Sequence, residues 1–476
     1  MRRVLIACIP IMIIYGCTMG PDYKRPQVEV PQSFRYEIKE AAAAADTQWW
    51  KQFGDPVLDR LIEEALRNNK GLDIAAANIE QAAGNLMATR SYLFPQLDYT
   101  GSASRQRLPE NGIGALLHKN PFSSFEVLAG AAWEIDLWGR YRRLTESARA
   151  SLLASREARR GVILSLVSEV AAAYFQLRAL DEQLIIAQRT LKAYAKSVKL
   201  FETQHKHGQV SAMTVEQARS QYETAAAAIP QIESQIALTE NALSILLGRN
   251  PGTIARGLPL AEISLPVVPA GLPSKLLERR PDILQAEQNL IAANAQIGAA
   301  RSLYFPSISL TGAYGVSSGE LSDLFKGSSR TWNYTGTVTG PIFTAGRIAG
   351  QIKQAEGAKQ ATLSAYELTI QSAFADMENA LISSRKLGEQ LSAEQRRVVA
   401  FREYERLSWL QYHEGYAPFL TVLYAQSQLF PSELSTIQAR AANLIGIVNI
   451  YKAMGGGWVD QAESLSISKP GSPVPK

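Results

Sequence analysis

The sequence is poor in the residues that build disulfides and metal centres. It has 476 residues but only two cysteines, Cys8 and Cys17, and four histidines. Both cysteines lie within the first seventeen residues, so the rest of the chain can form neither a disulfide framework nor a cysteine metal site. It also lacks a P-loop and a Gly-x-Ser-x-Gly motif. We therefore expect no cofactor, no metal and no enzymatic activity.

Charge of one sign is also scarce. Lys and Arg total 49 against 44 Asp and Glu, which gives a formal net charge of +5. Loss of Arg2 and Arg3 with a cleaved leader would lower this from +5 to +3. Proteins that bind nucleic acid usually carry a strongly basic face. The balance therefore argues against a nucleic-acid partner.

Long apolar runs are missing after the N-terminus. No later segment approaches 18 consecutive apolar residues, so we expect no transmembrane helix. A chain of this kind can span a membrane only as part of a closed β-barrel. Lipid offers no hydrogen-bond partner to backbone N–H and C=O groups, so every strand in the membrane must be paired on both edges.

The first 16 residues have the pattern of a targeting signal. Two arginines precede the apolar run Val4–Tyr15, which is too short to span a bilayer. Gly16-Cys17 follows, and Ile-Tyr-Gly-Cys resembles the lipobox at which bacterial lipoproteins are cleaved and acylated. We expect residues 1–16 to be a signal peptide and Cys17 to carry the lipid. A plain signal peptide with an incidental cysteine is the alternative. Leu-Ile-Ala-Cys, which ends at Cys8, also matches the lipobox locally, but a cut there would leave too few apolar residues before it.

The body of the chain is a duplication. Phe94-Pro95 recurs as Phe305-Pro306, 211 positions later, and Trp138-Gly139-Arg140 matches Ala345-Gly346-Arg347, 207 positions later. Internal repeats of about 200 residues indicate a duplicated half rather than a solenoid. We expect an N-terminal segment over 17–54, repeats over 55–248 and 274–455, a proline-rich connector over 249–273 and a C-terminal tail over 456–476.

Each repeat is predicted to contain two strands. In the first, apolar residues alternate with others from Phe125 to Ile135, and in the second, Ser, Thr and Gly alternate with apolar residues from Ser307. A soluble antiparallel sheet is one interpretation of this pattern. Aromatic residues near the strand ends, as in an interfacial girdle, favour a membrane sheet: these are Tyr99, Trp133, Trp138, Tyr314, Trp332 and Tyr334.

Helices flank the strands. We predict one helix over Pro56–Leu93, capped by Asp55, and its counterpart over Ser274–Tyr304. Arg140–Lys206 and Arg347–His413 are each 67 residues without proline, roughly 100 Å of helix at 1.5 Å per residue. Shorter helices return over Ser211–Leu247 and Pro418–Met454. The Phe-Pro pairs, Phe94-Pro95 and Phe305-Pro306, mark the join where each shaft helix ends and a strand begins.

Four strands per chain are too few to close a barrel. Single-chain bacterial barrels begin at eight strands, and an eight-stranded barrel from a dimer would be filled by side chains. A homotrimer would supply twelve strands around a wide lumen. The expected fold is an all-α shaft plus transmembrane β: a homotrimeric 12-stranded β-barrel continuous with a long α-helical barrel.

Five stretches together resemble the TolC family of outer membrane factors, specifically the lipid-anchored ducts of RND-type efflux pumps. The resemblance implies a homotrimer in the bacterial outer membrane, with its shaft in the periplasm, a periplasmic adaptor (membrane fusion protein) and an inner-membrane RND-type pump as partners. It implies a passive exit duct that performs no chemistry. The stretches are Gly16–Pro26, Trp49–Leu66, Arg280–Gly315, Gly340–Arg347 and Met454–Trp458.

The resemblance also implies functional positions at the far end of the shaft. The turns that face the adaptor include Gly208, Val210, Thr214, Gly415, Tyr416 and Pro418. The candidates for the tunnel constriction are Tyr412, Leu420, Thr421 and Tyr424. Acidic ring positions of relatives fall on Thr421 and Tyr424 here, so we expect Leu420 and Tyr424 to form a steric, apolar gate. Packing of these residues between helices is the alternative.

Other hypotheses use the same features. A duct for type I polypeptide secretion would share the fold, and a coiled-coil envelope scaffold would share the helices but have no pore. Metal binding by His205, His207 and His413 at the tips is a further alternative, which we do not favour because residues two apart on a helix do not share a face. The cargo is expected to be selected by the pump.

Overall fold

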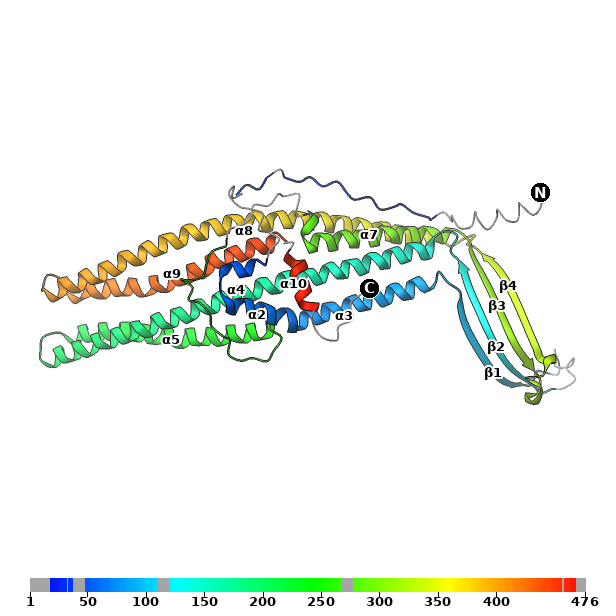
Figure 1. Ribbon diagram of the computed structural model, residues 1–476, viewed down its shortest axis with the longest axis horizontal. Coiled ribbons are helices and arrows are strands. Elements are labelled where there is room, and N and C mark those ends of the chain that lie inside the picture. The colour runs from blue at the N-terminus through cyan, green and yellow to red at the C-terminus, as the bar shows by residue number, and fades with distance from the viewer. Residues whose placement is uncertain are drawn as a thin grey trace. The chain divides into compact units, whose positions relative to one another are not determined.

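The computed structural model describes residues 18–31, 33–36, 48–109, 111, 120–266, 277–455 and 458–467 (Figure 1). The predicted signal peptide and Cys17 lie outside these residues. The chain divides into two units. Unit 1 comprises Met1–Gln27, Asn78–Arg156 and Gln285–Glu367, and unit 2 comprises Val28–Ala77, Glu157–Leu284 and Leu368–Lys476.

Unit 1 contains one antiparallel sheet in the order β1-β2-β3-β4 (Figure 1). Its strands are β1 (Gln96–Gln106), β2 (Phe122–Ile135), β3 (Ser307–Ser318) and β4 (Arg330–Thr339). Short 3-10 helices, η5 (Leu321–Asp323) and η6 (Gly327–Ser329), lie in the β3–β4 connection. Among the described strands, β1 pairs only with β2 and β4 only with β3, so each sheet edge is unpaired within one chain.

The register gathers the apolar side chains on one face of the sheet. Tyr99 lies opposite Ala129, Ala129 opposite Tyr314, and Tyr314 opposite Trp332. Successive strand residues point to opposite faces, so serines and threonines collect on the other side. The predicted two-faced sheet is confirmed, and its apolar face is exposed in the single chain: Leu97, Tyr99, Leu310, Tyr314, Trp332, Tyr334 and Val338.

The two longest helices match the prediction. They are α4 (Arg140–Lys206) and α8 (Arg347–His413), each of 67 residues. The returning helices are α5 (Ala212–Leu246) and α9 (Phe419–Ala453), each of 35 residues. Before the third strand, α7 (Pro281–Arg301) and the 3-10 turn η4 (Ser302–Tyr304) lead into β3.

The helix predicted over Pro56–Leu93 is instead two helices, α2 (Pro56–Asn68) and α3 (Lys70–Ser91). Asn69 has an extended backbone (ψ 128°) and separates them. Its side chain accepts from Leu72 N–H and donates 2.8 Å to the carbonyl of Leu246 in α5. The break therefore depends on a contact far away in sequence. The predicted N-cap is confirmed, since Asp55 Oδ1 accepts from Val57 N–H at 2.8 Å.

The core of unit 2 brings together tryptophans that are far apart in the sequence. Trp49 and Trp50, in the 3-10 helix η2 (Trp49–Phe53), are fully buried. Both rings contact Trp458, with centroids 5.9 and 5.5 Å apart. Trp458 begins α10 (Trp458–Ile467), a helix within the region predicted to be a tail. Trp49 also stacks on Tyr451 of α9 at 5.1 Å.

One described helix, α4, contains an 18-residue stretch apolar enough in composition to cross a membrane. The absence of an unbroken apolar run therefore did not exclude such a stretch. Of this stretch, 61% is buried within the chain. Ile163, Val167 and Val170 of α4 belong to the hydrophobic core of unit 2, which accounts for the composition.

Candidate functional site

The first helix-to-strand join, at Phe94-Pro95, is closed by a short turn. Phe94 N–H donates to the Ser91 carbonyl at 3.0 Å, and β1 begins directly after Pro95. Proline offers no N–H to continue the helix. From strand β2, Trp133 Nε1 donates to the carbonyl of Leu93 at 3.1 Å. The join is thereby fixed to the neighbouring strand.

The second join, at Phe305-Pro306, is held by another tryptophan. Phe305 N–H donates to the Ser302 carbonyl, and β3 begins after Pro306. Trp138, just beyond β2, donates from Nε1 to the Pro306 carbonyl at 2.8 Å. Its ring stacks on Phe305 at 4.6 Å and 26°. The girdle predicted for Trp133 and Trp138 stays a prediction; their hydrogen bonds to the joins could not be predicted, because they depend on carbonyls distant in sequence.

The turn from β2 into α4 is capped by Asp136. Its carboxylate accepts from the N–H groups of Tyr141 (3.1 Å) and Arg142 (2.9 Å), two of the donors that have no partner inside the first turn of a helix. Tyr141 OH donates to Glu134 of β2 at 2.9 Å. The strand and the helix are thus joined by charge-assisted hydrogen bonds.

The residues that follow Cys17 are fixed against this turn. Met19 N–H donates to the Trp138 carbonyl at 3.0 Å, and Arg143 Nε donates to the Met19 carbonyl at 3.0 Å. Arg143 also pairs with Asp22 at 2.7 Å. Asn294 of α7 donates to the Pro21 carbonyl at 2.9 Å. The start of the described chain therefore lies at the beginning of α4, where β2 ends.

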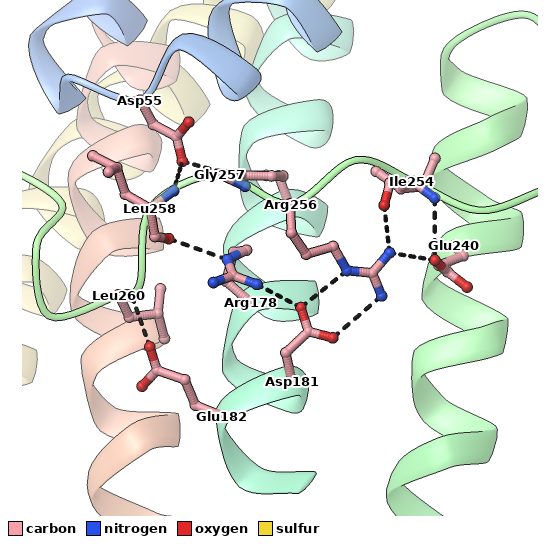
Figure 2. Close-up of polar contacts among 11 residues, drawn as sticks. Asp55, Arg178, Asp181, Glu182, Glu240, Ile254, Arg256, Gly257, Leu258 and Leu260 are labelled. Atoms are coloured by element: carbon pink, nitrogen blue, oxygen red, sulfur yellow. Dashed lines mark hydrogen bonds and ion pairs between the residues drawn. The ribbon is translucent and has the colours of Figure 1, made fainter. Parts of the chain in front are cut away.

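The described part of the connector, residues 249–266, crosses α4 and α5 and is held by a polar network (Figure 2). Arg256 pairs with Asp181 of α4 at 3.0 Å and with Glu240 of α5. Burial opposes protonation of Arg256, but its hydrogen bonds to Asp181 and Glu240 outweigh this effect and raise its pKa. For Glu240, burial would raise the pKa, but the hydrogen bonds from Arg256 and from Ile254 N–H lower it.

Asp55 is the buried centre of the same network. Besides capping α2, its carboxylate accepts from Tyr174 OH at 2.6 Å and from Leu258 N–H at 3.0 Å (Figure 2). Burial and the Asp55 carboxylate raise the pKa of Tyr174, which keeps this hydroxyl a donor. A Cβ at Gly257 would lie 2.1 Å from Asp55 Oδ1, so only glycine fits there.

Each of the two tip turns contains a glycine with a positive φ angle. Gly208 (φ 76°) ends the α4 side, and Gly415 (φ 78°) ends the α8 side, both in the left-handed region that glycine adopts easily. In the first turn the Val210 carbonyl lies 3.0 Å from His205 Nδ1, and Ser211 caps α5 through Thr214 N–H. The predicted tip residues Gly208, Val210, Thr214, Gly415, Tyr416 and Pro418 all lie in these two turns or in the first turn of the helix that follows.

An aromatic cluster joins the two tips. Phe201 of α4 lies 4.0 Å from Phe419 and 6.2 Å from Tyr412, measured between ring centroids. The other buried members come from α5 and α9: Val215, Ala218, Val422 and Leu423. Burial raises the pKa of Tyr412. Tyr412 is half-buried and packs against this cluster within one chain.

The other constriction candidates differ from Tyr412. Leu420 and Tyr424 lie four residues apart on one face of α9 and are 60% and 57% exposed. Thr421 lies beside them, half-buried. The exposed ring of Tyr424 makes an edge contact with Tyr404 of α8 at 6.2 Å. Leu420 and Tyr424 thus form an apolar surface that one chain leaves uncovered.

A charge network around the buried carboxylate of Glu433 was not predicted from the sequence. Glu433 of α9 is nearly buried and pairs with Arg189 of α4 (2.6 Å) and Arg402 of α8 (2.7 Å). Nearby, Tyr194 OH donates to the Gln426 carbonyl at 3.1 Å. A buried carboxylate between two guanidiniums ties three helices together.

The two tip histidines with described contacts, His205 and His413, contact different groups. His205 contacts the Val210 carbonyl, while His413 stacks on Trp409 with ring centroids 5.3 Å apart. Within the described ranges, no group of three His, Cys, Asp or Glu side chains is arranged to hold a metal ion.

Comparison with known proteins gives consistent results over almost the whole chain. The family described as outer membrane efflux protein matches residues 61–249 and 272–456, one segment in each repeat. The antibiotic efflux pump outer membrane protein ArpC of Pseudomonas putida is 38% identical over 97% of this chain and 96% of its own length. The cation efflux system protein CusC of Escherichia coli is 36% identical over 96% and 99%.

A solved structure agrees with the fold. The Campylobacter jejuni CmeC outer membrane channel matches with a TM-score of 0.88 and 25% identity, over 94% of this chain and 98% of that one. The helices, the four-stranded sheet and the two repeats are those of this fold. The chain therefore belongs to the outer membrane efflux protein family, and it is an outer-membrane efflux channel protein, not an enzyme.

Proposed function

We propose that three copies of this chain form the exit channel of a tripartite efflux pump. The observation that carries the proposal is the unclosed sheet, in which β1 and β4 each have one unpaired edge. A sheet edge inside a bilayer leaves backbone groups without partners, so it must be paired. Three copies supply twelve strands and pair every edge.

The two faces of the sheet suit lipid and water. The face with Tyr99, Tyr314 and Trp332 is apolar and exposed, as a lipid-facing surface requires. The opposite face carries serines, threonines and glycines, which suit a water-filled lumen. A soluble sandwich also has one apolar face but buries it, so the exposure of this face favours a membrane sheet.

A lipid on Cys17 would anchor the same assembly. The residues directly after Cys17 are held at the end of β2 by Met19, Pro21 and Asp22. This is the end of the sheet from which the helices leave, and a short anchor there would reach the inner boundary of the membrane. A mature protein without a lipid-modified cysteine would contradict this part of the proposal.

At the other end, the α4–α5 and α8–α9 turns are the surface for the periplasmic adaptor. The exposed face with Leu420 and Tyr424, repeated threefold, would form an apolar constriction. Tyr412 supports it from within the tip cluster, because it packs on Phe419 directly before Leu420. Thr421 lies beside that face. An inner-membrane pump of the RND type completes the system through the adaptor.

The relatives differ in what their names say they export, antibiotics in one case and cations in another. A common channel with different cargo is expected if the pump selects the substrate. The relatives named here are efflux components, which favours efflux over type I polypeptide secretion.

The assembly can be tested by mass. We expect the detergent-solubilised mature protein to have three times the mass of one chain in light scattering or native mass spectrometry. A monomer or dimer that still inserts in outer membranes would contradict the trimer, because four or eight strands would then have to enclose the channel.

A further inference from the structure

The turn between β4 and α8 leaves two large apolar side chains uncovered. Ile342 is fully exposed and Phe343 is 87% exposed in the single chain. The matching residues of the first repeat, Ile135 and Asp136, are half-buried, and Asp136 caps α4. The second turn therefore lacks a neighbour that the first turn has.

We propose that Phe343 packs against Phe94 at the helix-to-strand join of a neighbouring copy, and that Ile342 pairs there with Leu97. The proposal rests on the trimer proposed above, but it goes further by naming the contact and the register between copies. Phe94 is itself 55% exposed and Leu97 81% exposed, so both sides of the contact are uncovered in one chain.

The two turns share part of their backbone geometry, although Ala345 has a positive φ of 48° and β4 ends earlier than β2 relative to its helix. Gly139 and Gly346, at matching positions, have positive φ angles of 76° and 85°. Each is followed by the same hydrogen bond, from Arg143 N–H to the Gly139 carbonyl (2.9 Å) and from Gly350 N–H to the Gly346 carbonyl (2.8 Å). The packing of the first turn against a join of the same chain therefore indicates how the second turn packs against a join of a neighbouring chain.

Inside one chain, the first turn meets the second join, where Trp138 stacks on Phe305 at 4.6 Å. This happens because β2 and β3 are neighbours. In a closed ring β4 becomes the neighbour of β1 in the next copy, so the second turn meets the first join at Phe94. The counterpart of Trp138 is Ala345, which has no ring. Phe343, two residues earlier, is the aromatic side chain that this turn offers instead.

The repeat also fixes the register. Within the chain Ile135 lies opposite Ile308. The offsets of 207 and 211 convert this pair into Ile342 opposite Leu97 of the next copy. Because β4 ends at Thr339, this contact requires the register to continue for three residues beyond the strand. Continued along the strands, Val338 then lies opposite Gly101, and the apolar side chains of both strands share one face. A slip of one residue would turn the apolar face of one strand away from that of the other.

Cross-linking tests the contact directly. The chain has only two cysteines, Cys8 and Cys17, so introduced thiols are easily followed. We expect the variant with Phe343→Cys and Phe94→Cys, treated in membranes with a short bis-methanethiosulfonate linker, to give covalent dimers and trimers on non-reducing gels. Each single variant should stay monomeric. A second pair, Ile342→Cys with Leu97→Cys, covers the case in which loss of both rings prevents assembly.

Two controls give each outcome a meaning. The pair Trp138→Cys with Phe305→Cys should link within one chain, lose its thiols and stay monomeric on the gel. If that pair links while both interchain pairs fail in intact trimers, the inferred contact is wrong and the proposed channel stands. If the wild type forms no trimer, the proposed function fails as well.

Truncation of the ring provides an independent measurement. We expect Phe343→Ala to lower the temperature at which the solubilised trimer dissociates. Leu321→Ala removes a side chain that is 62% exposed in the β3–β4 connection and serves as the matched control. Equal dissociation temperatures for the two variants would overturn the assignment.

Discussion

Arg256 connects three segments of unit 2: the connector, α4 and α5. It lies between the carboxylates of Asp181 and Glu240, and its side chain is 30% exposed. Removal of one partner from such a group leaves charges in a partly buried place without compensation, which costs more than the pair itself contributes.

Substitution of this residue gives the first prediction. We expect Arg256→Met to lower the free energy of unfolding of unit 2 by about 1–3 kcal/mol, because Asp181 and Glu240 lose their shared cation. Thermal unfolding followed by circular dichroism measures this. Arg219→Met is the control, since Arg219 pairs with Glu202 and Glu216 on the exposed surface near the tip and its loss should hardly change the free energy of unfolding. Equal losses would contradict the role of the network.

The lowered pKa of Glu240 predicts a pH dependence. A carboxyl whose pKa is lower in the folded protein stabilises the fold above its unfolded pKa, about 4.3 for Glu. This stability is lost as the pH falls through the folded pKa. We expect Glu240→Gln to unfold at a lower temperature than the wild type between pH 5 and 7, and the difference to shrink below about pH 4. A difference that stays constant down to pH 3 would contradict this.

At the scale of elements, the face of α9 with Leu420 and Tyr424 gives a prediction about the closed channel. We expect Leu420→Ser combined with Tyr424→Ala to raise the single-channel conductance several-fold in planar bilayers, because both changes widen and wet an apolar ring. Met213→Ser, at an exposed position near the α5 end of the other turn, should leave it unchanged. Unchanged conductance in the double variant would mean that these residues only pack between helices.

The sequence predicted the long elements well and their contacts poorly. The absence of proline and the polar turns set the bounds of α4 and α8, and period-two alternation identified the strands and their apolar face. The break at Asn69 was not predictable, because it depends on the Leu246 carbonyl of another helix. For the same reason the alternating pattern did not predict that Trp133 and Trp138 each donate to a carbonyl of a join.

The roles of the candidate site residues stay a prediction, but the structure shows which of their backbone and packing features could be predicted. The turn glycines Gly208 and Gly415 were readable, since reversal of a helix requires positive φ. The resemblance grouped Tyr412 with Leu420, but the two side chains differ in exposure. Tyr412 packs against the tip cluster, and Leu420 lies on an exposed face of α9. Exposure of this kind is set by packing between helices, which a sequence pattern does not specify.

At the scale of the whole molecule, one chain has uncovered surfaces at its sheet edges, at its apolar sheet face and on α9. Each surface has a matching requirement: another strand, lipid, and the corresponding face of other copies. A passive channel explains all three without any reacting group. A coiled-coil scaffold would explain the helices but would leave the two-faced sheet without a purpose.

The most direct test is conductance of the purified wild-type protein in planar lipid bilayers. The account predicts discrete current steps of uniform size, one for each inserted trimer. Inserted trimers, verified by protection of the sheet from protease, that carry no current even with Leu420→Ser and Tyr424→Ala would contradict a water-filled channel.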